Sequence, residues 1–475
     1  MLKSFCKITP VLFNVGRNFS THFSPLSTIP VTVLSGFLGA GKTTLMNNIL
    51  TEKKPELRTA VLVNDMADIN VDADLVRNAG GESDGMVQLE NGCICCTLRD
   101  DLVIELATLA KKGDIDHIVV ESTGISEPHP VAQAFSLPVT SMQDETDDVK
   151  RAALIEATNG LDSLQDAAHL HSLVTVVDCA TFLHHLHSLE TLHEMGMSAS
   201  PDDNRPLAFL LMEQVQFANL ILVNKTDLVT DAERERISKF LTLLNPSATI
   251  MPTQHSAIDV SSLLSEQKYD EAQFSNMPAW AEELTKGPHS EADEYGIGNF
   301  TLQILGRPFH AERFFKFMQN QNLFTGVLRV KGCFWTQVDP NTRLDISLVG
   351  NTANVIINHI WTQTALELLD SQAEKLQETQ SDADISEGIE RMQQEAERLK
   401  EDSLWHPLTQ DRRVELVFIG DDRMQKDAIQ DALEAAMLTQ EELRGFLDSF
   451  QSGKTSPPPN STNPFANVPR CTVRI

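Results

Sequence analysis

The sequence predicts an α/β protein in which a doubly wound domain, with helices on both faces of a parallel sheet, precedes a second, α+β domain. Short apolar runs that do not alternate with polar residues indicate buried parallel strands. A glycine-rich loop follows the first of these runs and leads into a helical stretch. The length of 475 residues also favours more than one domain, because single cores rarely grow past about 250–300 residues.

Five apolar runs lie in the first half of the chain, with helical stretches between them. They cover residues 31–35, 59–63, 117–121, 173–178 and 219–223, and residues 42–50 form the first helical stretch. We therefore expect the doubly wound domain to span residues 28–255. Within it, residues 138–172 are polar and acidic and are expected to form a surface insertion.

The second half of the chain begins with an expected linker, residues 256–295, which is rich in Pro, Ser and acidic residues. The α+β domain is expected over residues 296–450. Its predicted strands are residues 300–305, 327–335, 344–349 and 414–419, and its predicted helices are residues 310–319 and 425–437. Thr439 and Glu442 have the spacing of a capping box, which predicts one more helix. Residues 364–402 indicate a charged helical insertion, and the Pro-containing residues 451–475 a disordered tail.

Composition narrows the classes of partner. The formal net charge is −29, and such a chain repels nucleic acids and anionic membrane surfaces, so neither is an expected partner. No apolar run approaches the roughly 20 residues of a membrane-spanning helix. The first acidic residue is Glu52, and residues 1–27 are basic and rich in hydroxyl groups, which is typical of a transit peptide. We expect import into the mitochondrial matrix, with plastid and cytoplasm as alternatives.

The glycine-rich loop fits the full G-x-x-x-x-G-K-[ST] pattern between a strand and a helix, which predicts a phosphate site. Glycines let backbone N–H groups converge on phosphate oxygens. Lys42 is expected to reach the β- and γ-phosphates, and the Thr43 hydroxyl to bind Mg²⁺. The residues assigned to phosphate binding here are Gly36, Gly39, Gly41, Lys42, Thr43 and Thr44.

An acidic residue at the end of another predicted strand completes the expected magnesium site. Glu121 closes the run 117–121, and its carboxylate can hold Mg²⁺ directly or through water. We assign catalytic roles to Lys42, Thr43 and Glu121. Gly124 follows shortly after and can bring its N–H group close to the γ-phosphate. Asp65, after the run 59–63, is a weaker candidate for the same magnesium ion.

The residues Asn224, Lys225 and Asp227 follow the fifth apolar run and predict recognition of guanine rather than adenine. The Asp227 carboxylate can accept hydrogen bonds from guanine N1–H and the exocyclic amine together, a pairing that adenine does not offer. Asn224 can bind the opposite edge of the base, and the stem of Lys225 can stack on the ring. The expected nucleotide is therefore GTP.

Three of the seven cysteines, Cys93, Cys95 and Cys96, crowd together between the second run and Glu121. Thiolates favour Zn²⁺, and three of them leave a fourth position open, which suits a transfer site. A redox pair and inert buried thiols are the alternatives. The histidines between residues 169 and 193 can hold metal, but a solvated surface is the simpler interpretation.

These motifs together resemble the CobW-like family of metallochaperone GTPases, also called zinc-regulated GTPase metalloprotein activators. The resemblance rests on residues 36–44, 92–99, 121–124, 214–219 with 224–227, 307–310 and 412–420. It implies a P-loop GTPase domain followed by a CobW-type C-terminal domain, zinc on the three cysteines, and zinc affinity linked to the nucleotide. Some relatives carry a docking motif before the GTPase domain, with which they engage methionine aminopeptidase. This leader has no such motif, which puts that client in doubt.

The function that these observations favour is GTP hydrolysis coupled to delivery of zinc to a client zinc metalloprotein, with GTP, Mg²⁺ and Zn²⁺ bound. A zinc buffer or sensor switched by GTP, and a cobalt chaperone for corrin-type cofactor synthesis, are the alternatives. Thiolate ligands favour zinc over cobalt. The sequence does not identify the client, and it leaves a homodimer open.

Overall fold

The computed structural model of the chain describes residues 28–63, 86–88, 98–136, 138–139, 148–158, 161–197, 203–265, 269, 296–368, 382–451, 464–465 and 470–474. The leader, Asp65 and the three clustered cysteines lie outside these residues. The chain divides into two compact units. The first holds most of the residues up to 279 and the second most of those from 280 onward.

The first unit is built on a seven-stranded parallel sheet in the order β3-β2-β4-β1-β5-β6-β7. This confirms the predicted fold class. Two short strands, the first and last in that order, were not predicted. The strands are β1 (Ile29–Ser35), β2 (Thr59–Val63), β3 (Met86–Gln88), β4 (His117–Glu121), β5 (Ala168–Asp178), β6 (Leu220–Asn224) and β7 (Thr249–Pro252).

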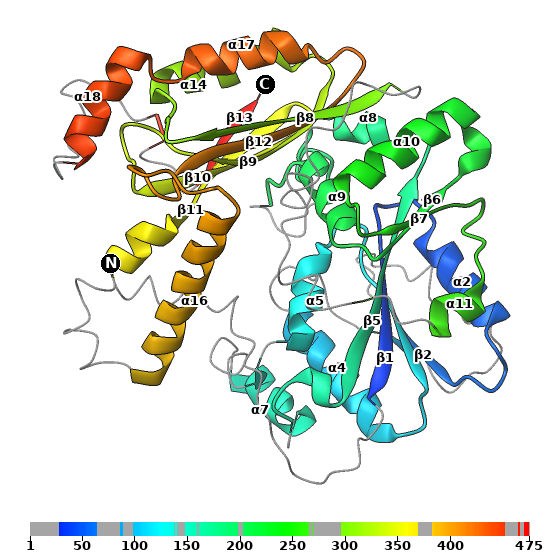
Figure 1. Cartoon of the computed structure of the whole chain (residues 1–475). Coiled ribbons are helices and arrows are strands. Elements are labelled where there is room, and N and C mark those ends of the chain that lie inside the picture. The colour runs from blue at the N-terminus through cyan, green and yellow to red at the C-terminus, as the bar shows by residue number, and fades with distance from the viewer. Residues whose placement is uncertain are drawn as a thin grey trace. The chain divides into compact units, whose positions relative to one another are not determined.

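Helices cover both faces of this sheet, as Figure 1 shows for α4 and α5 on one face and α2 and α11 on the other. Because successive side chains of a strand point to opposite faces, each face has its own buried cluster. Val33 and Val120 pack on the first face, Leu34 and Val119 on the second. The helices are α2 (Lys42–Glu52), α4 (Leu98–Lys112), α5 (Pro128–Ser136), α7 (Asp148–Ala157), α8 (Phe182–Leu186), α9 (Leu207–Gln216), α10 (Asp231–Leu244) and α11 (Val260–Ser265).

The segment expected as a surface insertion, residues 138–172, is partly core. Helix α7 packs against α4, and Leu154 and Leu164 are fully buried in the cluster beneath the sheet. The strand β5 also begins at Ala168, inside this range. The prediction of a surface insertion is therefore wrong for the described part of the segment. It relied on the acidic composition and gave no weight to the apolar residues between the acidic ones.

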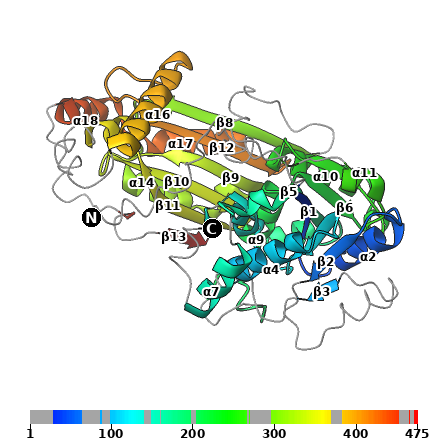
Figure 2. The ribbon, with the colours of Figure 1, turned by 90° about the horizontal axis from the view of Figure 1, so that it is seen from below.

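The second unit contains a six-stranded antiparallel sheet in the order β13-β11-β10-β9-β12-β8, whose strands lie side by side in Figure 2. This agrees with the predicted α+β architecture. Its strands are β8 (Ile297–Leu305), β9 (Val327–Phe334), β10 (Thr342–Val349), β11 (Thr352–Ile360), β12 (Arg413–Asp421) and β13 (Arg470–Arg474), and its helices α14 (Ala311–Met318), α16 (Asp382–Glu401), α17 (Lys426–Ala436) and α18 (Gln440–Gln451).

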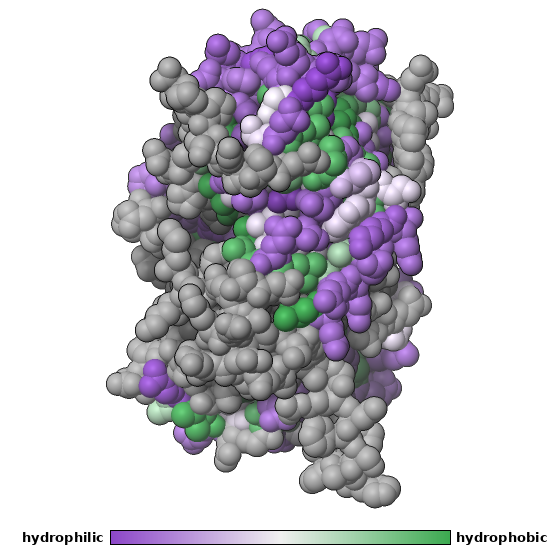
Figure 3. All heavy atoms as spheres, turned by 60° about the vertical axis from the view of Figure 1, so that its left-hand side comes forward, coloured by the Kyte–Doolittle hydropathy of each residue, from purple (hydrophilic) through white to green (hydrophobic). Residues whose placement is uncertain are grey.

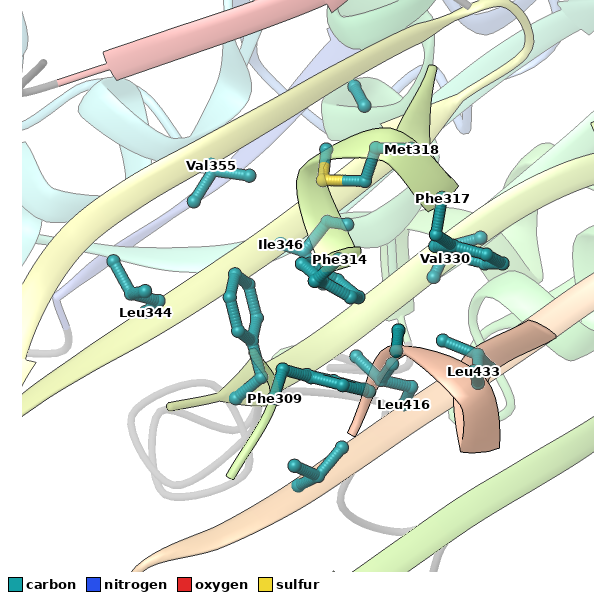
Figure 4. Packing of buried hydrophobic residues seen from close by; sticks show 14 of the residues in the cluster. Phe309, Phe314, Phe317, Met318, Val330, Leu344, Ile346, Val355, Leu416 and Leu433 are labelled. Atoms are coloured by element: carbon teal, nitrogen blue, oxygen red, sulfur yellow. The ribbon is translucent and has the colours of Figure 1, made fainter. Parts of the chain in front are cut away.

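Helices α14 and α17 cover one face of this sheet with an aromatic core, in which Phe309, Phe314 and Phe317 lie over Ile346 and Leu416 (Figure 4). The rings of Phe309 and Phe314 stack with centroids 4.3 Å apart. Such aromatic packing stabilises a fold beyond the area that it buries. The sheet and its helices therefore enclose a hydrophobic core of their own.

The predicted capping box at the start of α18 is present. The Thr439 backbone N–H donates to Glu442 at 2.7 Å, and the Glu442 backbone N–H donates to the Thr439 hydroxyl at 3.3 Å. The predicted disorder of the tail is wrong for two pieces: Phe465 is buried in the aromatic core, and β13 pairs with β11 and forms the edge of the sheet. An open sheet edge and an aromatic pocket outweigh the local Pro-rich composition.

Hydrophilic residues alternate with strips of hydrophobic ones on the face drawn in Figure 3. Among the described residues, no helix is both long and apolar enough to cross a membrane.

Candidate functional site

The glycine-rich loop joins β1 to α2 and has a backbone that only glycine tolerates at two points. Gly36 has a φ of 132°, and a Cβ there would lie 2.3 Å from the Val176 carbonyl oxygen. Gly41 has a φ of 115°, and a Cβ would lie 2.4 Å from the Asn224 amide nitrogen. Gly39, with a φ of 74°, completes the left-handed turn. The loop is thus shaped to bring backbone N–H groups together ahead of a helix N-terminus.

The first residues of α2 carry the predicted phosphate and magnesium ligands. The Lys42 ammonium donates to the Phe37 carbonyl oxygen at 3.2 Å, so the side chain folds back over the loop. The Thr43 hydroxyl donates to the Glu121 carboxylate at 3.0 Å, and Thr44 is exposed. The structure therefore brings together Thr43 and Glu121, which are 78 positions apart in the sequence.

This pair fits a magnesium ion, because hydroxyl and carboxylate oxygens are the protein ligands that Mg²⁺ prefers. Glu121 is 6% exposed at the carboxyl end of β4. A buried carboxylate costs free energy unless hydrogen bonds or a cation offset its charge, and the Thr43 hydroxyl supplies one such bond.

The loop after β4 lies directly against the glycine-rich loop. The backbone N–H and the hydroxyl of Ser122 both donate to the Leu34 carbonyl oxygen at 2.9 Å. A Cβ on Gly124 would lie 2.7 Å from the Leu38 backbone nitrogen. Gly124 therefore lies against the glycine-rich loop, and a larger residue there would push the two loops apart.

Asn224, at the end of β6, connects three loops. Its amide nitrogen donates to the Ala40 carbonyl oxygen at 2.8 Å and to the Ser256 hydroxyl at 3.0 Å. Its carbonyl oxygen accepts from the Ser256 backbone N–H at 2.9 Å, and the Ser256 hydroxyl donates to the Gly41 carbonyl oxygen at 2.9 Å. Asn224 is 2% exposed, and both its N–H donors bind protein groups. Asn224 therefore connects the end of β6 to the glycine-rich loop and to Ser256.

Lys225 and Asp227, the residues predicted to contact the base, follow Asn224 directly after β6. Lys225 has a φ of 61°, and its ammonium pairs with Asp178 at 2.8 Å, which holds the stem in a fixed direction. Asp227 is exposed and follows in a short 3₁₀ turn. An exposed carboxylate beside a fixed apolar stem can accept from the edge of a ring that stacks on that stem.

Three residues of the site were not predicted from the sequence. Ser256 falls in the range expected as a linker, yet it is fully buried beside Asn224. Asn48, on α2, donates to the carbonyl oxygens of His255 and Ser256 at 3.1 Å each. Gln214 donates to the loop after β4. Gln214 belongs to the stretch 214–219 that contributes to the family resemblance, but nothing in the sequence connects its amide with the loop after β4. Asn48 and Ser256 belong to no motif, and single polar residues on a helix or after a strand are too common to point to a site.

The predicted metal ligands Asp65, Cys93, Cys95 and Cys96 lie outside the described residues. Within the part of the chain that the structure describes, no three His, Cys, Asp or Glu side chains form a group that could hold a metal ion. The histidines between 169 and 193 accordingly form no such group there, although the rings of His184 and His185 lie 5.9 Å apart.

Comparison with known proteins identifies the family. Residues 30–160 and 149–252 match the CobW/HypB/UreG nucleotide-binding domain, and residues 299–437 match the cobalamin synthesis protein CobW C-terminal domain. The chain belongs to the CobW family of GTPases. Among its relatives, zinc-regulated GTPase metalloprotein activator 1 of Dictyostelium discoideum is 34% identical over 442 residues, which cover 89% of this chain and 84% of that protein.

Other relatives align over smaller shares of this chain. The zinc chaperone YjiA of Escherichia coli is 28% identical over 330 residues, covering 67% of this chain and 86% of YjiA. The crystal structure of Zn(II)-bound YjiA has 19% sequence identity and a TM-score of 0.33, covering 86% of this chain and 99% of that one. The family assignment confirms the predicted resemblance and the GTPase activity. The two domain matches also agree with the predicted order of a P-loop GTPase domain followed by a CobW-type C-terminal domain.

Proposed function

We propose that this CobW-family GTPase is a zinc metallochaperone, which takes Zn²⁺ as cargo on Cys93, Cys95 and Cys96 and delivers it to a client zinc metalloprotein. The proposal is supported by the names of its relatives, a zinc-regulated metalloprotein activator and zinc chaperones. The chemistry of the cysteine cluster agrees, because three thiolates bind zinc well and leave one position for a ligand from the client.

The observation that carries the proposal is the hydrogen bond between Thr43 and Glu121. It brings the glycine-rich loop to the strand end that closes the interval containing the cysteines. In the proposed complex, Lys42 and the loop N–H groups bind the phosphates of GTP, and Thr43 and Glu121 hold Mg²⁺. The magnesium ion would neutralise phosphate charge during hydrolysis. Gly124 would donate its N–H to the γ-phosphate.

Zinc and nucleotide would then be coupled through the chain between Asp65 and Glu121. Segments that contact the γ-phosphate reorder when it leaves, so a thiolate site on such a segment changes its geometry between the GTP and GDP states. Linkage is reciprocal: if GTP tightens zinc binding, zinc tightens GTP binding by the same factor. Typical coupling of this kind is roughly 5–150-fold.

A zinc competition titration with a chromophoric chelator, run with GDP and with a non-hydrolysable GTP analogue, tests this coupling. Cys95→Ser should weaken zinc binding and remove the coupling while GDP affinity stays nearly unchanged. Lys42→Ala should keep zinc binding but make it independent of nucleotide. Equal zinc affinities in both nucleotide states of the native protein would refute the chaperone mechanism and leave a zinc-binding GTPase with two unconnected sites.

A second assay distinguishes delivery from buffering. Zinc transfer to an acceptor should follow GTP hydrolysis in a chaperone, whereas a buffer would release zinc regardless of GTP. We also propose that residues 1–27 direct the protein to the mitochondrial matrix. A fluorescent fusion lacking residues 1–25 should remain in the cytosol with its GTPase activity intact, and a full-length fusion that stays cytosolic would contradict the targeting proposal.

A further inference from the structure

The loop after β4 carries Gly124 and is held by hydrogen bonds to its carbonyl groups. The Thr123 carbonyl oxygen accepts from the Ser126 backbone N–H at 3.1 Å and from the Ser126 hydroxyl at 2.8 Å. The Gly124 carbonyl oxygen accepts from the side-chain amide of Gln214 at 3.2 Å. The same amide donates to the Ser126 carbonyl oxygen, also at 3.2 Å.

These bonds fix the two peptide planes on either side of Gly124. The Thr123 carbonyl belongs to the plane that contains the Gly124 N–H, and the Gly124 carbonyl belongs to the next plane. Peptide planes are rigid, so only the φ and ψ angles of Gly124 relate one to the other. Glycine offers little steric resistance to rotation about those angles. Gln214 therefore supplies the restraint that the glycine itself lacks.

Gln214 is placed to act as a fixed support. It lies on α9, is 1% exposed, and its backbone carbonyl oxygen accepts from the Thr175 hydroxyl at 2.6 Å. Thr175 belongs to the strand β5 and is itself buried. A side-chain amide carries two N–H donors, and the amide of Gln214 donates to two carbonyl oxygens of the same loop. A side chain this enclosed has few alternative rotamers.

We infer that Gln214 is a positioning residue for the γ-phosphate, because it holds Gly124 in the orientation that aims its N–H group at the bound nucleotide. The inference rests on the placement of GTP proposed above, but not on zinc. GDP has no γ-phosphate for this loop to meet. Loss of the Gln214 amide should therefore affect GTP and leave GDP nearly unaffected, which a general weakening of the fold would not do.

Gln214→Met tests the inference, because methionine keeps an unbranched chain of similar length and removes both donors. Affinities for GDP and for a non-hydrolysable GTP analogue are measured by fluorescence titration, with Mg²⁺ present and a zinc-selective chelator in excess. The GTP analogue should bind about tenfold more weakly, corresponding to the loss of one or two buried hydrogen bonds. GDP affinity should stay within about twofold of the native value, because in the proposed complex only a γ-phosphate reaches this loop.

The matched control is Gln216→Met, the same replacement two residues along α9, where the side chain points to another side of the helix and is half-buried. It should change neither affinity. If Gln214→Met does not give folded protein, Gln214→Asn keeps the amide but shortens its reach, and the same selective loss is expected.

Two results would overturn the inference: equal weakening of both nucleotides, which would make Gln214 a structural residue only, or no weakening of either. Failure of the native protein to bind any guanine nucleotide would instead contradict the nucleotide assignment itself. Because zinc is chelated throughout, the outcome is independent of whether the chain delivers zinc.

Discussion

Removing the Ser256 hydroxyl should loosen the base end of the nucleotide pocket. Ser256→Ala deletes two hydrogen bonds, one donated to the Gly41 carbonyl oxygen and one accepted from Asn224. Both are inside the protein, where Ser256 is 0% exposed. At about 1 kcal/mol for each bond, the free energy of unfolding should fall by about 2 kcal/mol. The backbone N–H of residue 256 still donates to Asn224 in this variant.

Ser256→Gly removes the same hydroxyl but also relieves the backbone. Ser256 has a φ of 54° and follows His255, whose φ is 51°. A left-handed conformation costs a residue with a Cβ about 1–2 kcal/mol. Glycine avoids that cost but loses about 0.5–1 kcal/mol to the entropy of the unfolded chain. The glycine variant should therefore be more stable than the alanine variant by about 0.5–1 kcal/mol.

Urea unfolding of nucleotide-free protein measures the stabilities without the contribution of bound ligand. The dissociation rate of a fluorescent GDP analogue measures how firmly the site holds the nucleotide. Both variants should release GDP faster than the native protein and to a similar degree, because both lack the hydroxyl. A glycine variant less stable than the alanine variant would refute the strain argument, and native release rates in both would refute the role of the hydroxyl.

Three further predictions concern other parts of the first unit. Asp227→Asn should remove the preference for guanine over xanthine nucleotides, by about a hundredfold for two charge-assisted hydrogen bonds; equal binding of ATP and GTP by the native chain would contradict the guanine assignment. Glu121→Gln should raise the Mg²⁺ concentration needed for half-maximal GTP hydrolysis, and unchanged magnesium dependence would exclude Glu121 as a ligand. Burial, with the nearby His171 and His169, lowers the pKa of His117 from 6.5 to about 3. The unfolded chain therefore binds a proton at His117 more readily than the folded protein does. The free energy of unfolding should be unaffected by this group above about pH 6.5 and should fall by about 2 kcal/mol between pH 7 and pH 5. His117→Gln should reduce that loss in urea unfolding curves, and an equal loss in the variant would contradict it.

Much of the nucleotide site could be predicted from the sequence because its residues lie in short motifs next to strand ends. Thr43 follows a glycine-rich loop, and Glu121 closes an apolar run. In a parallel sheet the carboxyl ends of the strands share one edge, so the meeting of these two side chains follows from the topology. The same reasoning places Asn224 and Asp227 at that edge.

The tertiary hydrogen bonds of the site could not be predicted in this way. Ser256 is 215 residues from Gly41, and Gln214 is 90 residues from Gly124. Serine and glutamine are common, and neither has a spacing that requires a partner. The strands β3 and β7 were missed for a related reason, since they contain only three and four residues and gain their structure from pairing with a neighbouring strand rather than from their own pattern.

The two sets of hydrogen bonds divide the pocket into parts that respond to different groups of the nucleotide. Asn224 and Ser256 donate to the carbonyl groups of Ala40 and Gly41. In the proposed complex this connects the base-binding residues to the phosphate loop, so a change there should affect every guanine nucleotide. Gln214 attaches the loop of Gly124 to α9 instead, and only a nucleotide with a γ-phosphate reaches that loop in the proposed complex. Ser256→Ala should therefore weaken GDP and the GTP analogue alike, whereas Gln214→Met should weaken the analogue alone. Because the two variants share no hydrogen-bond partner, their effects on the analogue should multiply in the double variant. If the double variant binds the analogue as well as the single variant of lower affinity does, the two sets of hydrogen bonds act as one connected network.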